Sequence, residues 1–294
     1  MSVGMDSECI QCYLRRYIGL VRPLGSPEKA TRFAKELMKM ILAAPEDAAS
    51  PYLGPGVTDL LERMYGISPD RFREEKAASN RFAMAHLEEI RATAENAEDP
   101  VLAGLQFAIL GNYLDYSALG DRVNFQELDG MLEKALEMEL DRETYRKLRE
   151  ELFRGKNLLI LTDNAGEIAF DRVMAEEIQK AYPSLTVTFC VRGAVAANDA
   201  TRQDAAAVGI SFPVIDNGNR VAGTQLELLG EEAREAIRHA DVILAKGMGN
   251  VETMFGCGLN VYYAFLVKCP RISRLFDKPL MTPMLVSERS AVSG

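Results

Sequence analysis

Two pairs of oxygen-bearing side chains, Asp163–Asn164 and Asn198–Asp199, are the first candidates for chemistry in this 294-residue chain. Each pair follows a short apolar run that is typical of a strand covered on both faces. Carboxylate and amide oxygens are the ligands that hard cations such as Mg²⁺ and Mn²⁺ prefer. If the two runs are neighbouring strands, Asp163 and Asp199 would share one ion. The structural alternatives are a strand–helix turn for the first pair and a helix cap for the second.

A third candidate is the segment 246–250, KGMGN, which follows another apolar run. Lys246 supplies a positive charge, Gly247 and Gly249 allow close backbone approach, and the start of the next helix favours an anion such as phosphate. The segment has neither the Walker A pattern nor the GxGxxG spacing, so a structural turn is the alternative. Beside two acidic pairs, however, it indicates phosphoryl transfer, which needs both a metal and a cation.

Further polar residues and thiols stand in expected helices. Asn112 and Asp115 interrupt an apolar run and lie three residues apart, so they share a helix face. They either form hydrogen bonds within the core or face a cleft. Cys9 and Cys12 form one CxxC pair without a second, so a tetrahedral zinc site is poorly supported. We interpret them as structural thiols, with a metal or redox role as the alternative.

The elements that must position these residues change in type near the middle of the chain. Val occurs 5 times in residues 1–154 and 13 times in residues 155–294, and Val favours strands. Helical periodicity predicts helices at 28–42, 70–95, 100–119, 126–138 and 142–154. Apolar runs predict strands at 157–162, 186–191, 212–215, 242–245 and 261–267, with helices at 168–182, 197–208 and 231–239 between them. We therefore predict an α/β fold, in which a helical domain (1–154) packs on a Rossmann-like, doubly wound and mainly parallel sheet (155–294).

Composition excludes several classes of protein. The net charge is −9, which disfavours binding to nucleic acid or to an anionic membrane. Two His residues exclude a three-His metal site, and five Cys residues do not suit a secreted disulfide framework. Neither a signal peptide nor a run of 18 apolar residues is evident, so we expect a cytoplasmic protein. The oligomeric state is not defined by the sequence.

Four segments in this order resemble the damage-control phosphatase family, long catalogued as domain of unknown function 89. They are ILGNYLDY (109–116), TDNAGE (162–167), VRG with ANDAT (191–201) and KGMGN (246–250). The CIQC segment is similar to the stand-alone prokaryotic branch. The resemblance implies a divalent ion (Mn²⁺, Co²⁺, Ni²⁺ or Mg²⁺) held by Asp163, Asn164 and Asp199. It also implies a phosphate-binding Lys246, a Gly111–Asn112 motif and small phosphorylated metabolites as substrates.

We therefore expect a metal-dependent phosphomonoester hydrolase. Lys246 and the amides of the segment 247–250, including Gly247, Gly249 and Asn250, would balance phosphate charge. Arg192 and Asn112 are candidates for substrate contacts. Glu167, Asp115 and Asp216 are candidates for the general acid or base.

Two other functions stay open at this point. One is an S-adenosylmethionine-dependent methyltransferase, in which an acidic residue at the end of the second strand would hold ribose hydroxyls. The other is a non-enzymatic metal or redox module that uses Cys9 and Cys12.

Overall fold

Six strands form one sheet in the order β3-β2-β1-β4-β5-β6 in the computed structural model, which describes residues 3–291. The strands are β1 (Asn157–Leu161), β2 (Thr186–Val191), β3 (Val214–Asp216), β4 (Val242–Lys246), β5 (Val261–Leu266) and β6 (Pro283–Ser287). All neighbours run parallel except β5 and β6. Strands β2 and β3 lie on one side of β1, and β4, β5 and β6 lie on the other. The direction in which strands are added to the sheet therefore reverses at β1. Ligands of such sheets bind at the carboxyl ends of the strands around this point.

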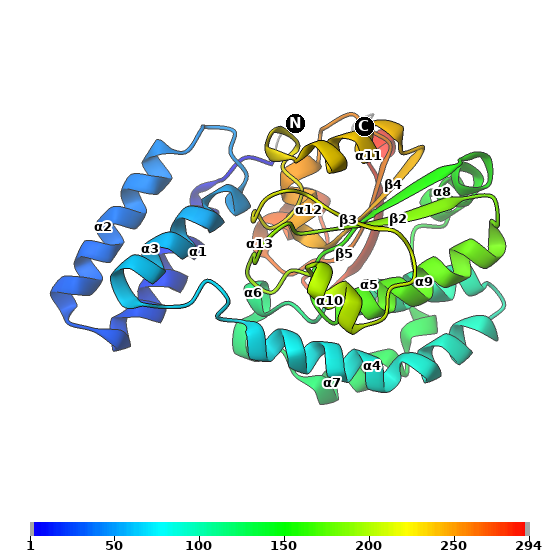
Figure 1. Cartoon of the computed structure of the whole chain (residues 1–294), viewed down its shortest axis with the longest axis horizontal. Helices are drawn as coiled ribbons and strands as arrows, with labels where there is room; N and C mark the ends of the chain where they lie inside the picture. Colours follow the sequence, from blue (N-terminus) through cyan, green and yellow to red (C-terminus); the bar gives the residue numbers. More distant parts are fainter. Residues whose placement is uncertain (1–2, 292–294) are drawn as a thin grey trace.

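Helices cover both faces of the sheet (Figure 1). On one face lie α4 (Arg73–Glu95), α5 (Pro100–Gly111), α7 (Phe125–Leu132), α8 (Arg142–Arg154), α9 (Glu167–Ala181) and α10 (Arg202–Ala207). On the other lie α11 (Glu231–His239), α12 (Gly247–Met254) and α13 (Pro270–Phe276). Successive strand residues alternate between the two cores: Leu158 and Ile160 belong to the first, and Leu159 and Leu161 to the second. The continuous apolar runs in the sequence follow from this double coverage.

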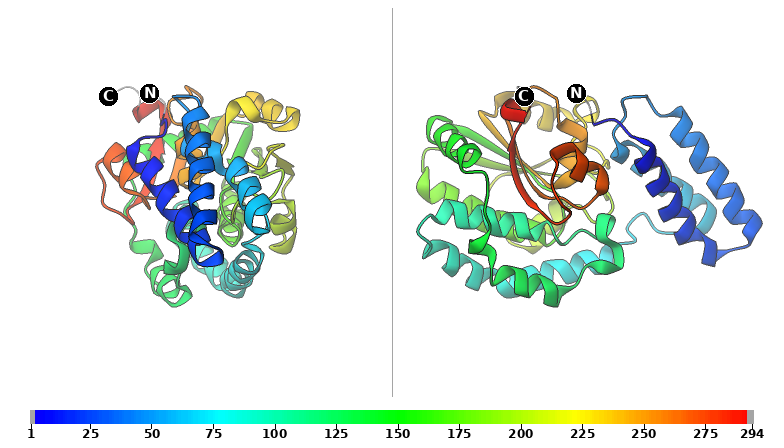
Figure 2. Two further views of the ribbon diagram at one scale, coloured as in Figure 1. Left: turned by 90° about the vertical axis from the view of Figure 1, so that its left-hand side faces the viewer. Right: turned by 180° about the vertical axis from the view of Figure 1, so that it is seen from behind.

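The first three helices, α1 (Ser7–Val21), α2 (Pro27–Ala43) and α3 (Gly54–Tyr65), form a lobe that stands beside the sheet (Figures 1 and 2). The lobe has its own core around Phe33, Leu37 and Leu61. Asp6 caps α1 by accepting hydrogen bonds from the backbone N–H groups of Glu8 and Cys9 at 3.0 Å. We call this unit the N-terminal lobe.

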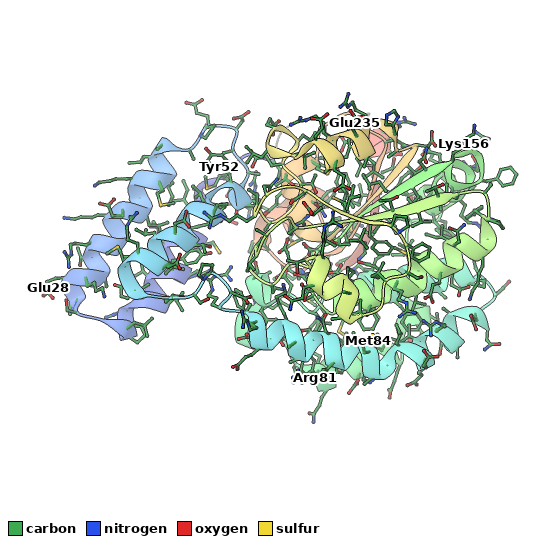
Figure 3. The ribbon with its side chains drawn as sticks, in the orientation of Figure 1. Glu28, Tyr52, Arg81, Met84, Lys156 and Glu235 are labelled. Carbon is green, nitrogen blue, oxygen red and sulfur yellow. The ribbon has the colours of Figure 1, made fainter. Side chains whose placement is uncertain are left out.

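Helix α4 follows the lobe and is amphipathic. Its inner side contributes Ala83, Leu87 and Ile90 to the core that it shares with the sheet. Arg81 and Met84 are exposed and project from its outer side (Figure 3). Helices of the predicted helical region therefore pack directly on the sheet, while the proposed boundary at residues 154 and 155 stays a prediction. No helix in residues 3–291 has the length and apolarity that a membrane span requires.

The predicted α/β class and the mainly parallel sheet are confirmed, and three local predictions are wrong. The expected helix 100–119 ends at Gly111, and a separate short helix, α6 (Tyr116–Leu119), is capped by Asp115. The expected helix 126–138 ends at Leu132 as α7, followed by a 3₁₀ turn. The expected helix 197–208 begins at Arg202, because a turn at Ala197 and Asn198 is followed by bridges from Asp199 to Asn164 and from Thr201 to Arg192.

Helices α3, α13 and α14 (Glu288–Ala291) and strand β6 were not predicted. Helix α3 begins in a Gly-Pro-Gly segment that suggests a loop, but Pro stands in its first turn, where no backbone N–H is needed. Strand β6 is five residues long, begins with Pro and pairs antiparallel at the sheet edge, a place that tolerates Pro. The short helix α14 follows β6.

Candidate active site

The polar segments after β1 and β2 meet at the carboxyl edge of the sheet. Leu161 is level with Cys190 of β2 and with Ala245 of β4, so the segments that follow these strands emerge side by side. Asn164 and Asp199 form an isolated antiparallel bridge. The Ala200 N–H donates to the Asp163 carbonyl at 2.7 Å, and the Ala165 N–H donates to the Asn198 carbonyl at 2.9 Å. These backbone bonds bring the two predicted acidic pairs together.

The first pair does stand in the strand–helix connection between β1 and α9, whereas the second pair does not cap the following helix. Helix α10 is capped by Thr201, whose side chain and Asp204 form a capping box, so Asp199 is not the cap. The turn after Asn164 is held by Gly166, whose φ of 81° favours glycine. The Gly166 N–H donates to Asn80 Oδ1 on α4 at 2.7 Å. Asp163, Asn164 and Asp199 all line one cavity.

Asp163 lies at the centre of the site. Its Oδ2 accepts hydrogen bonds from Asn112 Nδ2 at 3.0 Å and from Asn164 Nδ2 at 2.8 Å. Its Oδ1 lies 4.0 Å from Arg192 Nη2. Burial raises the pKa of Asp163 well above its ordinary value, and the neighbouring carboxylates of Glu167 and Asp199 raise it further. A carboxylate in such surroundings needs a positive charge or a proton beside it.

Asp199 is also buried, and its Oδ2 accepts a hydrogen bond from Arg192 Nε at 2.6 Å. Burial raises the pKa of Asp199 although Arg192 acts in the opposite direction. Asn164 Oδ1 accepts from Asn198 Nδ2 at 2.7 Å, and an amide oxygen has a second lone pair. Within residues 3–291 no three His, Cys, Asp or Glu side chains form a group suited to a metal ion. A metal here would therefore combine two carboxylates with the amide oxygen of Asn164.

This donor set fits a hard divalent cation. Its oxygens belong to the class that Mg²⁺ and Mn²⁺ prefer, and the excess negative charge around Asp163 favours a cation.

Because Gly247 has no side chain, the Asp163 carboxylate can pack against the start of α12. The φ of Gly247 is 74°, and a Cβ atom at this position would lie 1.8 Å from Asp163 Oδ2. No side chain caps α12, whose first turn contains Gly249 at the cavity wall. The unpaired N–H groups of this turn favour anions.

Lys246 and Glu167 lie beneath the site and are fully buried. Lys246 Nζ donates to Glu167 Oε1 at 2.7 Å and to the Ala108 carbonyl at 2.8 Å, and it lies 3.2 Å from Asp171 Oδ1. Desolvation acts to lower the pKa of Lys246, but the two carboxylates outweigh it and raise the pKa. Burial raises the pKa of Asp171 to about 7. Lys246 thus has three partners within the protein and does not line the cavity.

Glu167 joins this buried group to the residues above it. Its Oε2 accepts from Asn112 Nδ2 at 2.9 Å and from Asn164 Nδ2 at 2.8 Å. Asn112 therefore touches both Asp163 and Glu167, and its Oδ1 accepts from the Leu266 N–H at 3.1 Å. Asn112 and Glu167 hold the site from below instead of facing the cavity.

Three other predicted residues also lie outside the cavity wall. Arg192 is buried and donates to Asp199 and to the Thr162 carbonyl. Asn250 donates to the carbonyls of Leu161, Thr162 and Lys246 at the ends of β1 and β4, and accepts from Thr224. Asp216 forms an ion pair with Arg202 at 2.7 Å.

Lys268, just after β5, is a candidate that sequence reasoning missed. Its Nζ donates to the Asn112 carbonyl at 2.6 Å and to Asp115 Oδ2 at 2.7 Å, and both Lys268 and Asp115 line the cavity. The Lys268 side chain is buried, and these two bonds use two of the three N–H donors of its ammonium group. The only hint in the sequence was a Lys directly after an apolar run, without a motif around it.

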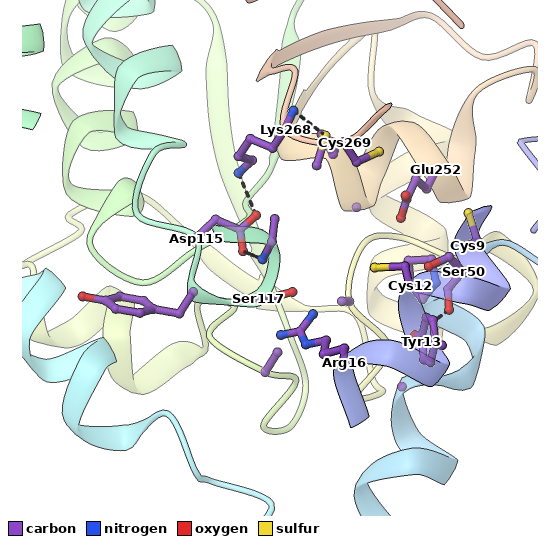
Figure 4. A pocket seen from close by; sticks show the side chains of 18 of the residues that line it. Cys9, Cys12, Tyr13, Arg16, Ser50, Asp115, Ser117, Glu252, Lys268 and Cys269 are labelled. Atoms are coloured by element: carbon purple, nitrogen blue, oxygen red, sulfur yellow. Dashed lines mark hydrogen bonds and ion pairs between the residues drawn. The ribbon is translucent and has the colours of Figure 1, made fainter. Parts of the chain in front are cut away.

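A cavity of about 610 Å³ lies between the sheet edge and the N-terminal lobe. The sheet side contributes Asp163, Asn164, Asp199, Asp115 and Lys268. The face of α1 contributes Cys9, Cys12, Tyr13 and Arg16, which follow helical spacing (Figure 4). Volumes of about 300–1,000 Å³ are typical of sites for small molecules.

Both residues of the CxxC pair line this cavity. Cys9 is buried, and its Sγ accepts a hydrogen bond from Arg271 at 3.5 Å, whereas Cys12 is exposed. Burial raises the pKa of Cys9, which disfavours a reactive thiolate. The role of these thiols stays a prediction.

Comparisons with known proteins agree with the geometry. Residues 5–282 match the damage-control phosphatase ARMT1-like domain. An uncharacterised protein of Methanocaldococcus jannaschii is 31% identical over 92% of this chain and 91% of its own length. A damage-control phosphatase of Archaeoglobus fulgidus is 32% identical over 74% of this chain and 76% of its own. The crystal structure of a DUF89 family protein from Pyrococcus horikoshii superimposes with a TM-score of 0.81 and 26% identity, covering 97% of this chain and 99% of the other.

Proposed function

Because the chain belongs to the damage-control phosphatase ARMT1-like family, we infer that it is a phosphatase of the house-cleaning type, acting on small phosphorylated metabolites. We propose that it depends on a divalent metal ion and hydrolyses phosphomonoesters. Family membership favours this function over a methyltransferase.

The metal would be held by Asp163, Asn164 and Asp199. When bound, a divalent ion polarises a phosphoryl oxygen and makes a nearby water molecule more acidic. Asn112 and Asn164 keep Asp163 in one orientation through its Oδ2, which leaves Oδ1 for the ion. Arg192 does the same for Asp199 through Oδ2. Mn²⁺, Co²⁺, Ni²⁺ and Mg²⁺ are the candidate ions.

The phosphoryl group would lie between these oxygens and Lys268. The third N–H of Lys268 would donate to a phosphoryl oxygen, while Asn112 and Asp115 hold the other two. The N–H groups at the start of α12, next to Gly247 and Gly249, would contribute further donors. Asp115 faces the cavity and would accept a proton or orient a water molecule.

Lys246 and Glu167 would act as positioning residues. Lys246 holds Glu167 Oε1 in place, and the Oε2 atom of the same carboxylate accepts hydrogen bonds from Asn112 and Asn164. A buried ion pair of this kind holds its neighbours in one arrangement, and loss of one partner leaves an unpaired buried charge.

The observation that carries the proposal is the convergence of Asp163, Asn164, Asp199 and Lys268 at one cavity wall. Buried acids and a cation at the same wall are what binding a metal and a phosphate together requires.

The test is a panel of phosphomonoesters assayed after chelation and after addition of each metal. We expect activity to need the metal, and Asp163→Asn or Asp199→Asn to lower kcat/KM at least about 100-fold. Asp216→Asn is the matched control, since this residue ends β3, which pairs with β2, but its carboxylate pairs with Arg202 outside the cavity. Full metal-dependent activity in Asp163→Asn and Asp199→Asn would exclude the proposed metal site.

A further inference from the structure

Acidic and basic side chains both line the cavity. Asp163 and Asp199 face it from the sheet, and Arg15, Arg16 and Arg71 line it from the side of the N-terminal lobe. In a chain of net charge −9, arginines gathered at one cavity are unexpected. Such a wall raises the local concentration of anions.

These arginines differ from the other cations of the cavity in lacking carboxylate partners. Arg220 is paired with Asp59, Arg271 with Asp6, and Lys268 with Asp115. By contrast, among the side chains that the structure describes, no Asp or Glu oxygen lies within the 4.0 Å ion-pair distance of Arg15, Arg16 or Arg71. Arg15 is exposed and also borders the outer face of α1, so Arg16 and Arg71 are the two best placed.

Arg16 and Arg71 are held by aromatic rings. Their guanidinium carbons lie 5.6 and 5.7 Å from the ring centre of Tyr17, and that of Arg71 lies 4.8 Å from the ring centre of Phe72. Tyr17 is buried in the core of the lobe, so it is a fixed support. Stacking of this kind orients a guanidinium and leaves its N–H edge open for an anion.

The direction of Arg16 is visible in Figure 4. Its guanidinium extends from α1 across the cavity towards the segment that carries Asp115 and Ser117. A cavity of about 610 Å³ is larger than inorganic phosphate needs, so it leaves room for the rest of a metabolite between the two walls.

We propose that Arg16 and Arg71 form a second anion subsite, which binds a carboxylate or phosphate of the substrate other than the phosphoryl group that is cleaved. The preferred substrates are then phosphomonoesters that carry another anionic group. This inference rests on the proposed phosphatase function and specifies its substrate class.

The test compares three probes of the same ring size: phenyl phosphate, 4-carboxyphenyl phosphate and 1,4-phenylene bisphosphate. With Mn²⁺ present, we expect a lower KM for the two probes with a second anion. Arg16→Gln and Arg71→Gln should each raise that KM about tenfold, which is the loss of one charge-assisted hydrogen bond, or about 1.4 kcal/mol. The KM for phenyl phosphate should change less than about twofold. The anionic probe whose KM rises more on substitution of the arginines shows whether the subsite prefers a carboxylate or a phosphate.

Arg32→Gln is the matched control, since Arg32 is an exposed arginine of α2 outside the cavity wall. Calorimetric binding of phenylphosphonate and 4-carboxyphenylphosphonate, which are not hydrolysed, gives a readout that does not depend on catalysis. Tighter binding of the carboxylated phosphonate, if it is lost in Arg16→Gln, would support the subsite. Should none of the three phosphate probes be hydrolysed, the phosphatase proposal would be rejected while the subsite would still stand. Hydrolysis with equal effects of the substitutions on all probes would reject the subsite alone.

Discussion

Asp163 shows how a single residue can be poor for stability and suited to function. Its carboxylate is buried beside Glu167 and Asp199, and burial and these charges together raise its pKa. Gly247 allows this arrangement, because any side chain there would occupy the place of Asp163 Oδ2. Sites that bind ions commonly store unfavourable interactions of this kind until the ion arrives.

We therefore predict that Asp163→Asn stabilises the protein in the absence of metal. The amide retains an oxygen for Asn112 and Asn164 but carries no charge beside Glu167 and Asp199. We expect a gain of about 1–2 kcal/mol in the free energy of unfolding, measured with urea after chelation.

With metal bound, we expect the wild type to be more stable than Asp163→Asn, the opposite of the order expected without metal. An ion at 100 times its Kd stabilises the wild type by about 2.7 kcal/mol, and Asp163→Asn should show little of this response. A variant that is less stable than the wild type without metal would contradict the account of Asp163 as an unbalanced charge.

At the scale of elements, α5 and α9 approach closely because α5 carries glycines where the two helices touch. A Cβ at Gly104 would lie 2.9 Å from Met174 Cα, and one at Gly111 would lie 2.4 Å from Phe170 Cδ2. Both glycines lie on one face of α5, two turns apart. Because Asn112 follows Gly111 directly, the contact between α5 and α9 determines the position of the Asn112 side chain relative to Asp163.

We predict that Gly111→Ala forces α5 and α9 apart. Phe170 is fully buried and has little room to move, so the added methyl group should cost about 1–3 kcal/mol of stability. The displacement of Asn112 should also lower kcat/KM. Urea unfolding and the phosphomonoester assay measure the two effects.

Gly130→Ala is the control for this prediction. Gly130 lies in α7, and a Cβ there would meet nothing within 4 Å. Alanine favours helices over glycine by up to about 1 kcal/mol, so this variant should be neutral or more stable. Equal behaviour of the two variants would mean that the approach of α5 to α9 is not what requires Gly111.

The sequence predicted most of the sheet because its covered strands appear as continuous apolar runs, and the polar residues after β1 and β2 then follow from the parallel topology. It did not predict Lys268, since one lysine after a strand has no distinguishing pattern. It assigned Lys246 to the phosphate because strand ends usually face a ligand. In the structure Lys246 is instead paired inside the protein with Glu167 and Asp171, which come from another helix.

At the scale of the whole molecule, the cavity exists because the N-terminal lobe stands opposite the sheet edge. Ion pairs join the two parts at the surface: Asp59 of α3 to Arg220, and Glu8 of α1 to Arg274. Exposed pairs of this kind contribute little to stability, about 0–1 kcal/mol each. Glu252 of α12 also lines the cavity, and this acid has no role in the proposed reaction.

Glu252 should make the stability of the protein depend on pH. Burial raises its pKa from 4.5 to about 7; Arg271 acts in the opposite direction, and Asp115 and Asp6 add to the rise. Between these two pH values the folded state keeps a proton that the unfolded state has released. Each increase in pH within this window therefore lowers the free energy of unfolding, and the loss is complete above about pH 7.

We predict that Glu252→Gln removes part of this loss. Between pH 5 and pH 8 the wild type should lose roughly 1–2 kcal/mol more than the variant, a value reduced for solvent at the cavity wall. The other buried acids remain in both proteins, so the difference between the two urea-unfolding curves isolates Glu252. Glu98→Gln, at an exposed carboxylate without an ion pair in the described chain, should leave the pH dependence unchanged. A Glu252→Gln protein that loses as much stability as the wild type would show that Glu252 ionises in the folded cavity as it does in water.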